Sequence, residues 1–347
     1  MHISAFFKQD AMKTFILSNN NGMNAEVTNY GGRIMRLMVP DRDGKMQDVV
    51  LGFNTAEDYL RERNLSDFGA AIGRYANRIG QGRFTLEGRT YQLPQNNGPH
   101  CLHGGPTGWQ YSLFEVVDNC RNAISFELTS PDGDNGFPGT VKVRMTYRLT
   151  EDNTLAIDYE ATTDAPTVIN MTNHSYFNLN GDGKSSILNH ILQIDADRFL
   201  PIDPTSLPTG AIAEVADSPF DFRKPKAIGI DIAREDQQLR NGSGYDHNWL
   251  LNRPGDDSLP CARLASPLTG IVMEVFTTEP GMQVYTGNFL DGSQRGKGGA
   301  AYPRRSAVCL ETQKYPDSPN HNWPESDARL RPGERFTSRT RFKFSTL

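Results

Sequence analysis

Four side chains that can move protons stand in short polar stretches of a chain otherwise rich in alternating apolar residues. They are His174 in NMTNHSYFNL, His103 in NNGPHCLHGG, Asp246 in GYDHNW and Glu311 in VCLETQKYPD. Imidazole and carboxyl groups are the usual general acids and bases near neutral pH, because their ordinary pKa values are about 6.5 and 4.3. A carboxylate in an apolar strand is costly to bury unless it is paired or transfers protons. The pattern therefore indicates acid–base chemistry.

The stretch around His174 reads partly as a strand with an unusual polar face. Alternation places His174 on one face with the following amides, hydroxyl and phenol: Asn170, Thr172, Tyr176 and Asn178. Such a face suits a ligand rich in hydroxyl groups, since each group offers a directed hydrogen bond. Carbohydrate fits that description. The same pattern is equally compatible with a structural histidine in a buried polar network.

The second histidine stretch, residues 96–105, ends in a double glycine that lets backbone approach a ligand closely. His103 is the candidate there, whereas His100, beside Pro99, is predicted to be a surface loop residue. Upstream, GRYANRIGQGRF places Asn77 next to Arg78. Alone, that pair is a weak signal, and it would also suit a solvated strand end.

Metal and cofactor motifs are missing from the sequence. The histidines form no HxH or HExxH pattern, and no glycine-rich phosphate loop or dinucleotide fingerprint is present. The four cysteines, at positions 101, 120, 261 and 309, form no CxxC pair. We expect no cofactor and no metal, with a zinc site assembled from distant strands as the weaker alternative.

The elements that must position these residues are predicted to be strands. Period-2 alternation is clearest at 141–149 and recurs at 124–128, 154–162 and 339–347. Glycine-containing turns separate the runs, at 41–44, 86–89, 131–136 and 331–334. Helix signals are confined to 55–62 and 231–242. Because parallel strands need long, usually helical crossovers, we predict an all-β antiparallel sandwich formed by a single domain over 1–347.

Bulk composition limits the partners and the compartment. The 347 residues carry a net charge of −5 without long Lys or Arg runs, which argues against nucleic-acid and anionic-membrane binding. The first 22 residues are interrupted by polar residues before a signal-peptide core can form, and no run approaches the roughly 18 apolar residues of a membrane span. We expect a cytoplasmic protein with a small uncharged partner. A monomer and a homodimer are both compatible with the sequence.

Seven motifs in order give the sequence a family resemblance. They are GRYANRI, LHGG, SPDGDNGFPG, NMTNHSYFNL, GYDHNW, EPGMQVYTGNFLDG and LETQKYPDSPN. Together they resemble the aldose 1-epimerase (galactose mutarotase) family, from YGGRIMRLMVP near the N-terminus to LRPGE near the C-terminus. The resemblance implies a large antiparallel β-sandwich with an open sugar cleft. It also implies interconversion of the α and β anomers of a free aldohexose, with galactose and glucose as the expected sugars.

Residue roles follow from the resemblance position by position. Glu311 matches the base that removes the anomeric hydroxyl proton, His174 the acid that protonates the ring oxygen, and His103 a second histidine near that oxygen. Residues matching those that hold the sugar hydroxyls are Asn77, Arg78, Asp246 and Gln283. From ordinary pKa values we expect a charged His174 beside an ionised Glu311, with activity falling as Glu311 protonates and as His174 loses its proton.

Three alternatives remain open at this point. A glycoside hydrolase could use Asp246 and Glu311 as its two carboxylates, although both histidines would then lack a role. A hexose-6-phosphate 1-epimerase should show a cationic cluster for the phosphate. A non-catalytic carbohydrate-binding module would use the same polar cleft without proton transfer.

Overall fold

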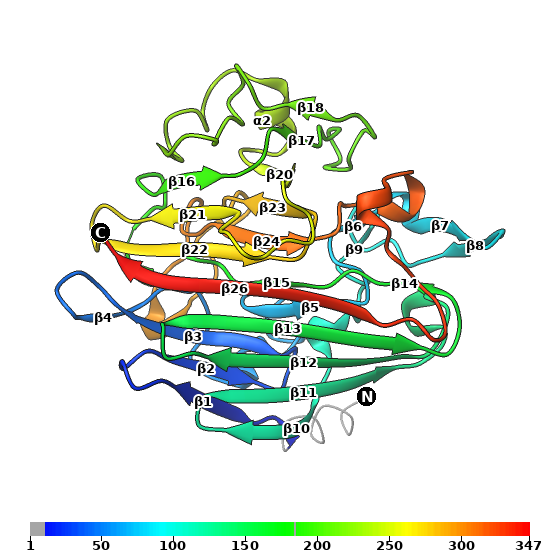
Figure 1. The fold of residues 1–347 in the computed structure, drawn as a ribbon, viewed down its shortest axis with the longest axis horizontal. Coiled ribbons are helices and arrows are strands. Elements are labelled where there is room, and N and C mark those ends of the chain that lie inside the picture. Colours follow the sequence, from blue (N-terminus) through cyan, green and yellow to red (C-terminus); the bar gives the residue numbers. More distant parts are fainter. Residues whose placement is uncertain (1–10, 184) are drawn as a thin grey trace.

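One long antiparallel sheet forms the largest layer of the protein, whose computed structural model describes residues 11–183 and 185–347 (Figure 1). Nine strands pair in this sheet, in the spatial order β10 (Glu115–Cys120), β11 (Ala123–Ser130), β12 (Val141–Leu149), β13 (Thr154–Thr163), β26 (Phe336–Thr346), β22 (Ile271–Thr277), β21 (Ala262–Ala265), β16 (Ile191–Ile194) and β19 (Lys226–Ala227). The C-terminal strand β26 lies between β13 and β22 and so joins two halves of the sheet that are distant in sequence.

The predicted alternation is confirmed in this sheet. In β12, Val143, Met145 and Tyr147 are buried, while Lys142, Arg144 and Arg148 on the other face are exposed. The strand predictions at 124–128, 154–162 and 339–347 fall within β11, β13 and β26, apart from the last residue of the third range. Each strand buries its apolar face on the same side because the side-chain period of two matches the pairing register.

Two smaller antiparallel sheets complete the main architecture. One has the order β1 (Thr14–Ser18), β2 (Asn24–Thr28), β3 (Arg33–Pro40), β4 (Met46–Asp48). The other has the order β18 (Ala213–Glu214), β17 (Arg198–Phe199), β20 (Asp246–Leu250), β23 (Gly281–Tyr285), β24 (Cys309–Gln313). Apolar side chains from both sheets share one continuous core with the long sheet, among them Val27, Trp249, Val284 and Leu310. The result is the predicted all-β sandwich.

Four short strand pairs and a few helical turns link these sheets. The pairs are β14 (Thr167–Val168) with β25 (Arg329–Leu330), β15 (Thr172–His174) with β5 (Ala70–Ile72), β6 (Arg78–Ile79) with β9 (Cys101–Leu102), and β7 (Arg83–Leu86) with β8 (Arg89–Gln92). The strand predicted around His174 is thus limited to three residues. Its flanking amides explain why: Asn170 donates to Ala76 O and Lys314 O, and Asn178 donates to Ser185 O and Ser306 O.

Helices are short throughout the described residues. The α-helix is α2 (Gln237–Asn241), and the 3₁₀ turns are η1 (Ala56–Tyr59), η2 (Gly80–Gly82), η3 (Trp109–Tyr111), η4 (Asp134–Gly136), η5 (Lys297–Gly299), η6 (Ser318–Asn320) and η7 (Pro324–Ser326). The predicted helix at 231–242 begins only at Gln237, where Asp236 caps it by accepting from two backbone N–H groups. Across the part of the chain that the structure covers, no helix has the length and apolarity to cross a membrane.

The buried side chain of Lys297, in η5, links this turn to β3, to β4 and to the residues that follow β4. Lys297 Nζ donates to Met35 O, Val50 O and Asp48 Oδ2 at 2.7–2.9 Å. Because charge and hydrogen bonds are paired inside the protein, the cost of burying the ammonium group is offset.

Candidate active site

The five-stranded sheet presents a polar face that carries three of the predicted residues. Its register places Gln283 of β23 opposite Glu311 of β24, and Asp246 of β20 opposite Tyr285 of β23. Residues directly opposite one another project from the same face, so all four side chains share a side. Gln283 Nε2 donates to Asp246 Oδ1 at 2.7 Å. Alternation sends the intervening Trp249, Val284 and Leu310 into the core.

His174 reaches the same place from β15. Its backbone pairs with Ala70 of β5, and its Nε2 lies 3.6 Å from Glu311 Oε2. The imidazole stacks on the Tyr176 ring at a centroid distance of 4.9 Å and an interplanar angle of 12°. Histidine and carboxyl are almost fully enclosed, with side-chain exposures of 6% and 2%. Packing therefore fixes the geometry of the His174–Glu311 pair.

His103 is held by reciprocal contacts with the chain before β6. Its backbone N–H donates to Asn77 O, and the Asn77 N–H donates to His103 Nδ1, both at 3.1 Å. Since Nδ1 accepts a hydrogen bond, a neutral His103 carries its own proton on Nε2. Gly104 follows with φ of +77°, and an added Cβ would lie 2.2 Å from Gly73 O, so the double glycine is required by the tight turn. The His103 and His174 rings meet edge to face at 5.3 Å.

A hollow of about 220 Å³ collects these groups, which is smaller than the roughly 300–1,000 Å³ of pockets for drug-sized ligands. Six of the seven predicted residues line it: Asn77, Arg78, His103, His174, Asp246 and Glu311. Gln283 is buried behind the surface and acts on Asp246 through its hydrogen bond. The space is suited to one sugar ring.

Burial dominates the ionisation of the His174–Glu311 pair. It raises the pKa of Glu311 well above its ordinary value, and Asp246 and Asp67 raise it further while Arg78 opposes them. Burial lowers the pKa of His174 to about 3, with His103 acting in the same direction and Asp67 in the opposite one. The pKa of His103 also falls to about 3, through burial and then Arg78. Neither charge of the pair is well solvated here.

Both shifts favour the neutral forms of the two side chains, so a proton held by the unliganded pair is favoured on Glu311 over His174. The sequence prediction of a charged His174 beside an ionised Glu311 used ordinary pKa values, and desolvation acts against it. What the chemistry requires is one proton shared by an acid and a base in contact.

Several polar atoms at the site lack partners in the described parts of the chain. Buried atoms without a hydrogen bond include Glu311 Oε2, His174 Nδ1, Gln283 Oε1 and Asp67 Oδ1. Unsatisfied buried polar atoms are uncommon in proteins, since each costs about 1–3 kcal/mol. A ligand that brings several hydroxyl groups would satisfy them.

Two groups of side chains bring donor atoms within 4.8 Å of one another: Asp67, His103 and His174, and His174, Cys309 and Glu311. The hydrogen bonding of His103 is unfavourable for metal binding. A ligating histidine donates its other N–H to an acceptor, whereas His103 Nδ1 accepts from Asn77 N. The Cys309 thiol is buried, and its pKa is raised well above the ordinary value by desolvation. Both features favour proton chemistry over metal ligation at this site.

Sequence reasoning missed five residues that line the hollow: Asp67, Asn97, Leu102, Tyr285 and Phe289. Phe289 is 63% exposed at its edge, and its ring lies 6.1 Å from that of Tyr285. Aromatic residues in a turn-rich segment are the sequence signal that could have indicated Tyr285 and Phe289.

The prediction for His100 is wrong, because this residue is buried. Its Nδ1 accepts from Gln81 N, and its Nε2 lies 2.7 Å from Thr205 Oγ1. Proline next to it suggested a surface loop, but hydrogen bonds to two distant loops enclose the ring. His100 is structural.

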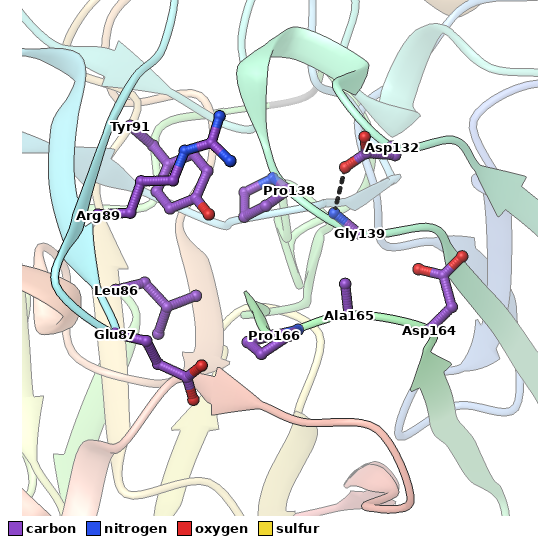
Figure 2. Close-up of a pocket in the computed structure, with 10 residues that line it drawn as sticks. All are labelled: Leu86, Glu87, Arg89, Tyr91, Asp132, Pro138, Gly139, Asp164, Ala165 and Pro166. Atoms are coloured by element: carbon purple, nitrogen blue, oxygen red, sulfur yellow. Dashed lines mark hydrogen bonds between the residues drawn. The ribbon is translucent and has the colours of Figure 1, made fainter.

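A second hollow, of about 660 Å³, lies between the β7–β8 hairpin and the loops that flank β12 and β13 (Figure 2). Its acids are already paired: Asp132 Oδ1 accepts from Gly139 N, Glu87 Oε1 pairs with Arg331, and Asp164 Oδ1 accepts from Thr140 N. Its lining residues include no histidine. Despite its size, this hollow lacks the groups needed for proton transfer.

An antiparallel β-sandwich with a buried imidazole–carboxyl pair in a polar hollow defines a class of protein suited to acid–base chemistry on a small hydroxylated ligand. Comparison with known proteins narrows the class. The family model for aldose 1-epimerase matches residues 13–343. The chain is 45% identical to galactose mutarotase of Mus musculus, over 93% of this chain and 91% of that protein, and 40% identical to aldose 1-epimerase of Escherichia coli K12, over 94% of each.

Solved structures agree. A crystal structure of an aldose epimerase homologue from C. elegans superposes with a TM-score of 0.89 at 33% identity, covering 97% of this chain and 99% of that one. Galactose 1-epimerase from Lactobacillus acidophilus gives 0.84 at 31%, covering 96% and 95%. The chain belongs to the aldose 1-epimerase family, and it is an isomerase acting on carbohydrates. The hydrolase, 6-phosphate and binding-module alternatives are not favoured.

Proposed function

We propose that this protein interconverts the α and β anomers of free aldohexoses such as galactose and glucose, with Glu311 as the base and His174 as the acid. The 3.6 Å contact between His174 and Glu311 in a buried polar hollow carries the proposal. The names of the relatives supply the sugar. The role of each residue follows from the family resemblance, and the proximity of the residues supports it.

The reaction needs one proton removed and one delivered. Glu311 takes the proton from the anomeric hydroxyl O1 while His174 gives one to the ring oxygen O5, and the C1–O5 bond breaks to leave an open aldehyde. Rotation about C1–C2 and closure from the other face reverse both transfers. Sugar hydroxyls that donate to Glu311 favour its ionised form, so binding moves the shared proton towards His174. His103 Nε2–H is the proposed second donor to O5.

The remaining predicted residues are proposed to hold the sugar hydroxyls. Asp246 accepts from the sugar while Gln283 fixes its other oxygen, and Arg78 is itself positioned by Asn97 at 3.1 Å. Asn77 acts by positioning two other residues. Its backbone N–H donates to His103 Nδ1, and its side-chain oxygen accepts a hydrogen bond from the Arg78 backbone N–H. Charge-assisted hydrogen bonds of this kind orient a hydroxylated ring strongly.

Polarimetry on freshly dissolved α-D-galactose tests the activity directly. The protein should speed the approach to the equilibrium rotation, and the Glu311→Gln variant should lose that effect while still binding sugar. Release of phenol from aryl galactosides would instead indicate hydrolysis. Undiminished mutarotation by Glu311→Gln would remove the proposed mechanism.

Cellular setting and assembly are also proposals. The four cysteines are unpaired, which supports a reducing, cytoplasmic location. Every residue assigned a role comes from one chain, so a monomer can carry the reaction and a homodimer is not required for it. A free sugar is the proposed partner, with no nucleic acid, membrane or cofactor.

A further inference from the structure

Asp67 is an acidic residue in the site to which the mechanism assigns no task. It lies in the loop between η1 and β5, just before β5 pairs with the His174 strand. Its side chain lines the sugar-sized hollow and also a neighbouring hollow of about 260 Å³. Asp67 Oδ1 is buried and has no hydrogen-bond partner among the described residues. A buried carboxylate oxygen without a partner calls for a donor from outside the chain.

The position of Asp67 relative to the His174–Glu311 pair is defined. One Asp67 oxygen and one ring nitrogen each of His103 and His174 all lie within 4.8 Å of one another. Glu311 is not in that group but in a second one, which also contains His174. Both carboxyl groups therefore lie close to His174, and His103 belongs with Asp67 and not with Glu311 in this grouping.

Sugar geometry connects this placement with a particular hydroxyl. The ring oxygen of a pyranose lies between C1, which carries the anomeric hydroxyl, and C5, which in an aldohexose carries the hydroxymethyl group. If the imidazoles face the ring oxygen and Glu311 takes the C1 side, the C5 side faces Asp67. The oxygen nearest to Asp67 is then the 6-hydroxyl.

We propose that Asp67 is a specificity-determining residue that accepts a hydrogen bond from the 6-hydroxyl of the bound aldohexose. This inference rests on the proposed function, because it uses the placement of the ring oxygen at the two histidines. It predicts discrimination against sugars that lack a 6-hydroxyl. It also disfavours 6-phosphates, because Arg78 is the only cationic side chain among the residues lining the two hollows.

Four proteins and two sugars test the proposal. The wild type and the variants Asp67→Ala, Asp67→Asn and Asp291→Asn are assayed by polarimetry with D-galactose and 6-deoxy-D-galactose, which differ only at O6. Asp291 is the matched control, since it lines the neighbouring hollow alone and its carboxylate accepts from Ser293. Thermal unfolding midpoints establish that each variant is folded, and Asp67→Asn keeps the side-chain shape if Asp67→Ala does not fold.

We expect the preference for D-galactose over 6-deoxy-D-galactose to fall in the two Asp67 variants and in neither of the other two proteins. The wild type and Asp291→Asn should favour D-galactose in kcat/KM by about tenfold to a hundredfold, which is typical of a hydrogen bond to a charged group. Asp67→Ala should bring that ratio close to one, mainly by losing activity on galactose, and Asp67→Asn should lower it.

Two outcomes overturn the inference: no discrimination by the wild type, or equal losses on both sugars in the Asp67 variants. The failure of the wild type to accelerate galactose mutarotation at all would instead refute the proposed function. The two failures are therefore distinguishable.

Discussion

Replacement of Glu311 by glutamine should separate catalysis from stability. The amide keeps the shape of the side chain but cannot take a proton from O1, and loss of general base catalysis costs roughly 10²–10⁴-fold in kcat. Because burial raises the pKa of Glu311 well above its ordinary value, the folded protein binds this proton more tightly than the unfolded chain does.

The sign of the stability effect follows from that proton. Below the unfolded pKa of about 4.3 both states are protonated, and Glu311 contributes no pH dependence. Above it, the unfolded chain ionises freely while the folded one does not, so the carboxyl destabilises the fold by about 1.4 kcal/mol for each pH unit between the two pKa values. Glu311→Gln removes this penalty. The variant should therefore be inactive, and it should gain stability over the wild type as the pH rises from 4 to 8.

Urea unfolding at several pH values, alongside polarimetry, measures both effects. Glu87→Gln is the control, because Glu87 is a half-exposed surface acid paired with Arg331, and it should change neither quantity by more than about 0.5 kcal/mol. An active Glu311→Gln would refute the assignment of the base. An inactive variant whose stability relative to the wild type falls with rising pH would refute the protonated state of the buried carboxyl.

Three other predictions concern pH, binding and the fold. Because burial lowers the pKa of His174 to about 3, the pair takes up a second proton only near that pH, so kcat/KM should show no acid decline between about pH 6 and 4.5; an acid midpoint in that range would contradict this. Asp246→Asn should lower kcat/KM by about 10- to 150-fold, and a loss confined to thermal stability would exclude a sugar contact. Lys297→Ala should destabilise the fold by about 1–3 kcal/mol, because Met35 O and Val50 O lose their charged donor while Asp48 keeps Arg36; an unchanged unfolding free energy would show that the network is dispensable.

Strands and turns were predictable because their signal is local. Alternation at 141–149 and 154–162 is dictated by one buried and one solvated face, and neighbouring turns carry the glycines that hairpins need. The extent of β15 was not predictable, since Asn170 and Asn178 bond to backbone more than a hundred residues away. The burial of His100 was hidden for the same reason.

The sequence by itself determined the fold class, the family resemblance and the set of polar residues in their motifs. All seven predicted site residues are brought together, six on the hollow and Gln283 behind it. Tertiary structure alone decided the directions in which the pKa values of His174 and Glu311 shift and the place of Asp67. The physical reason is that desolvation and unpaired hydrogen-bonding capacity depend on what surrounds a group in space, and local sequence does not encode those surroundings.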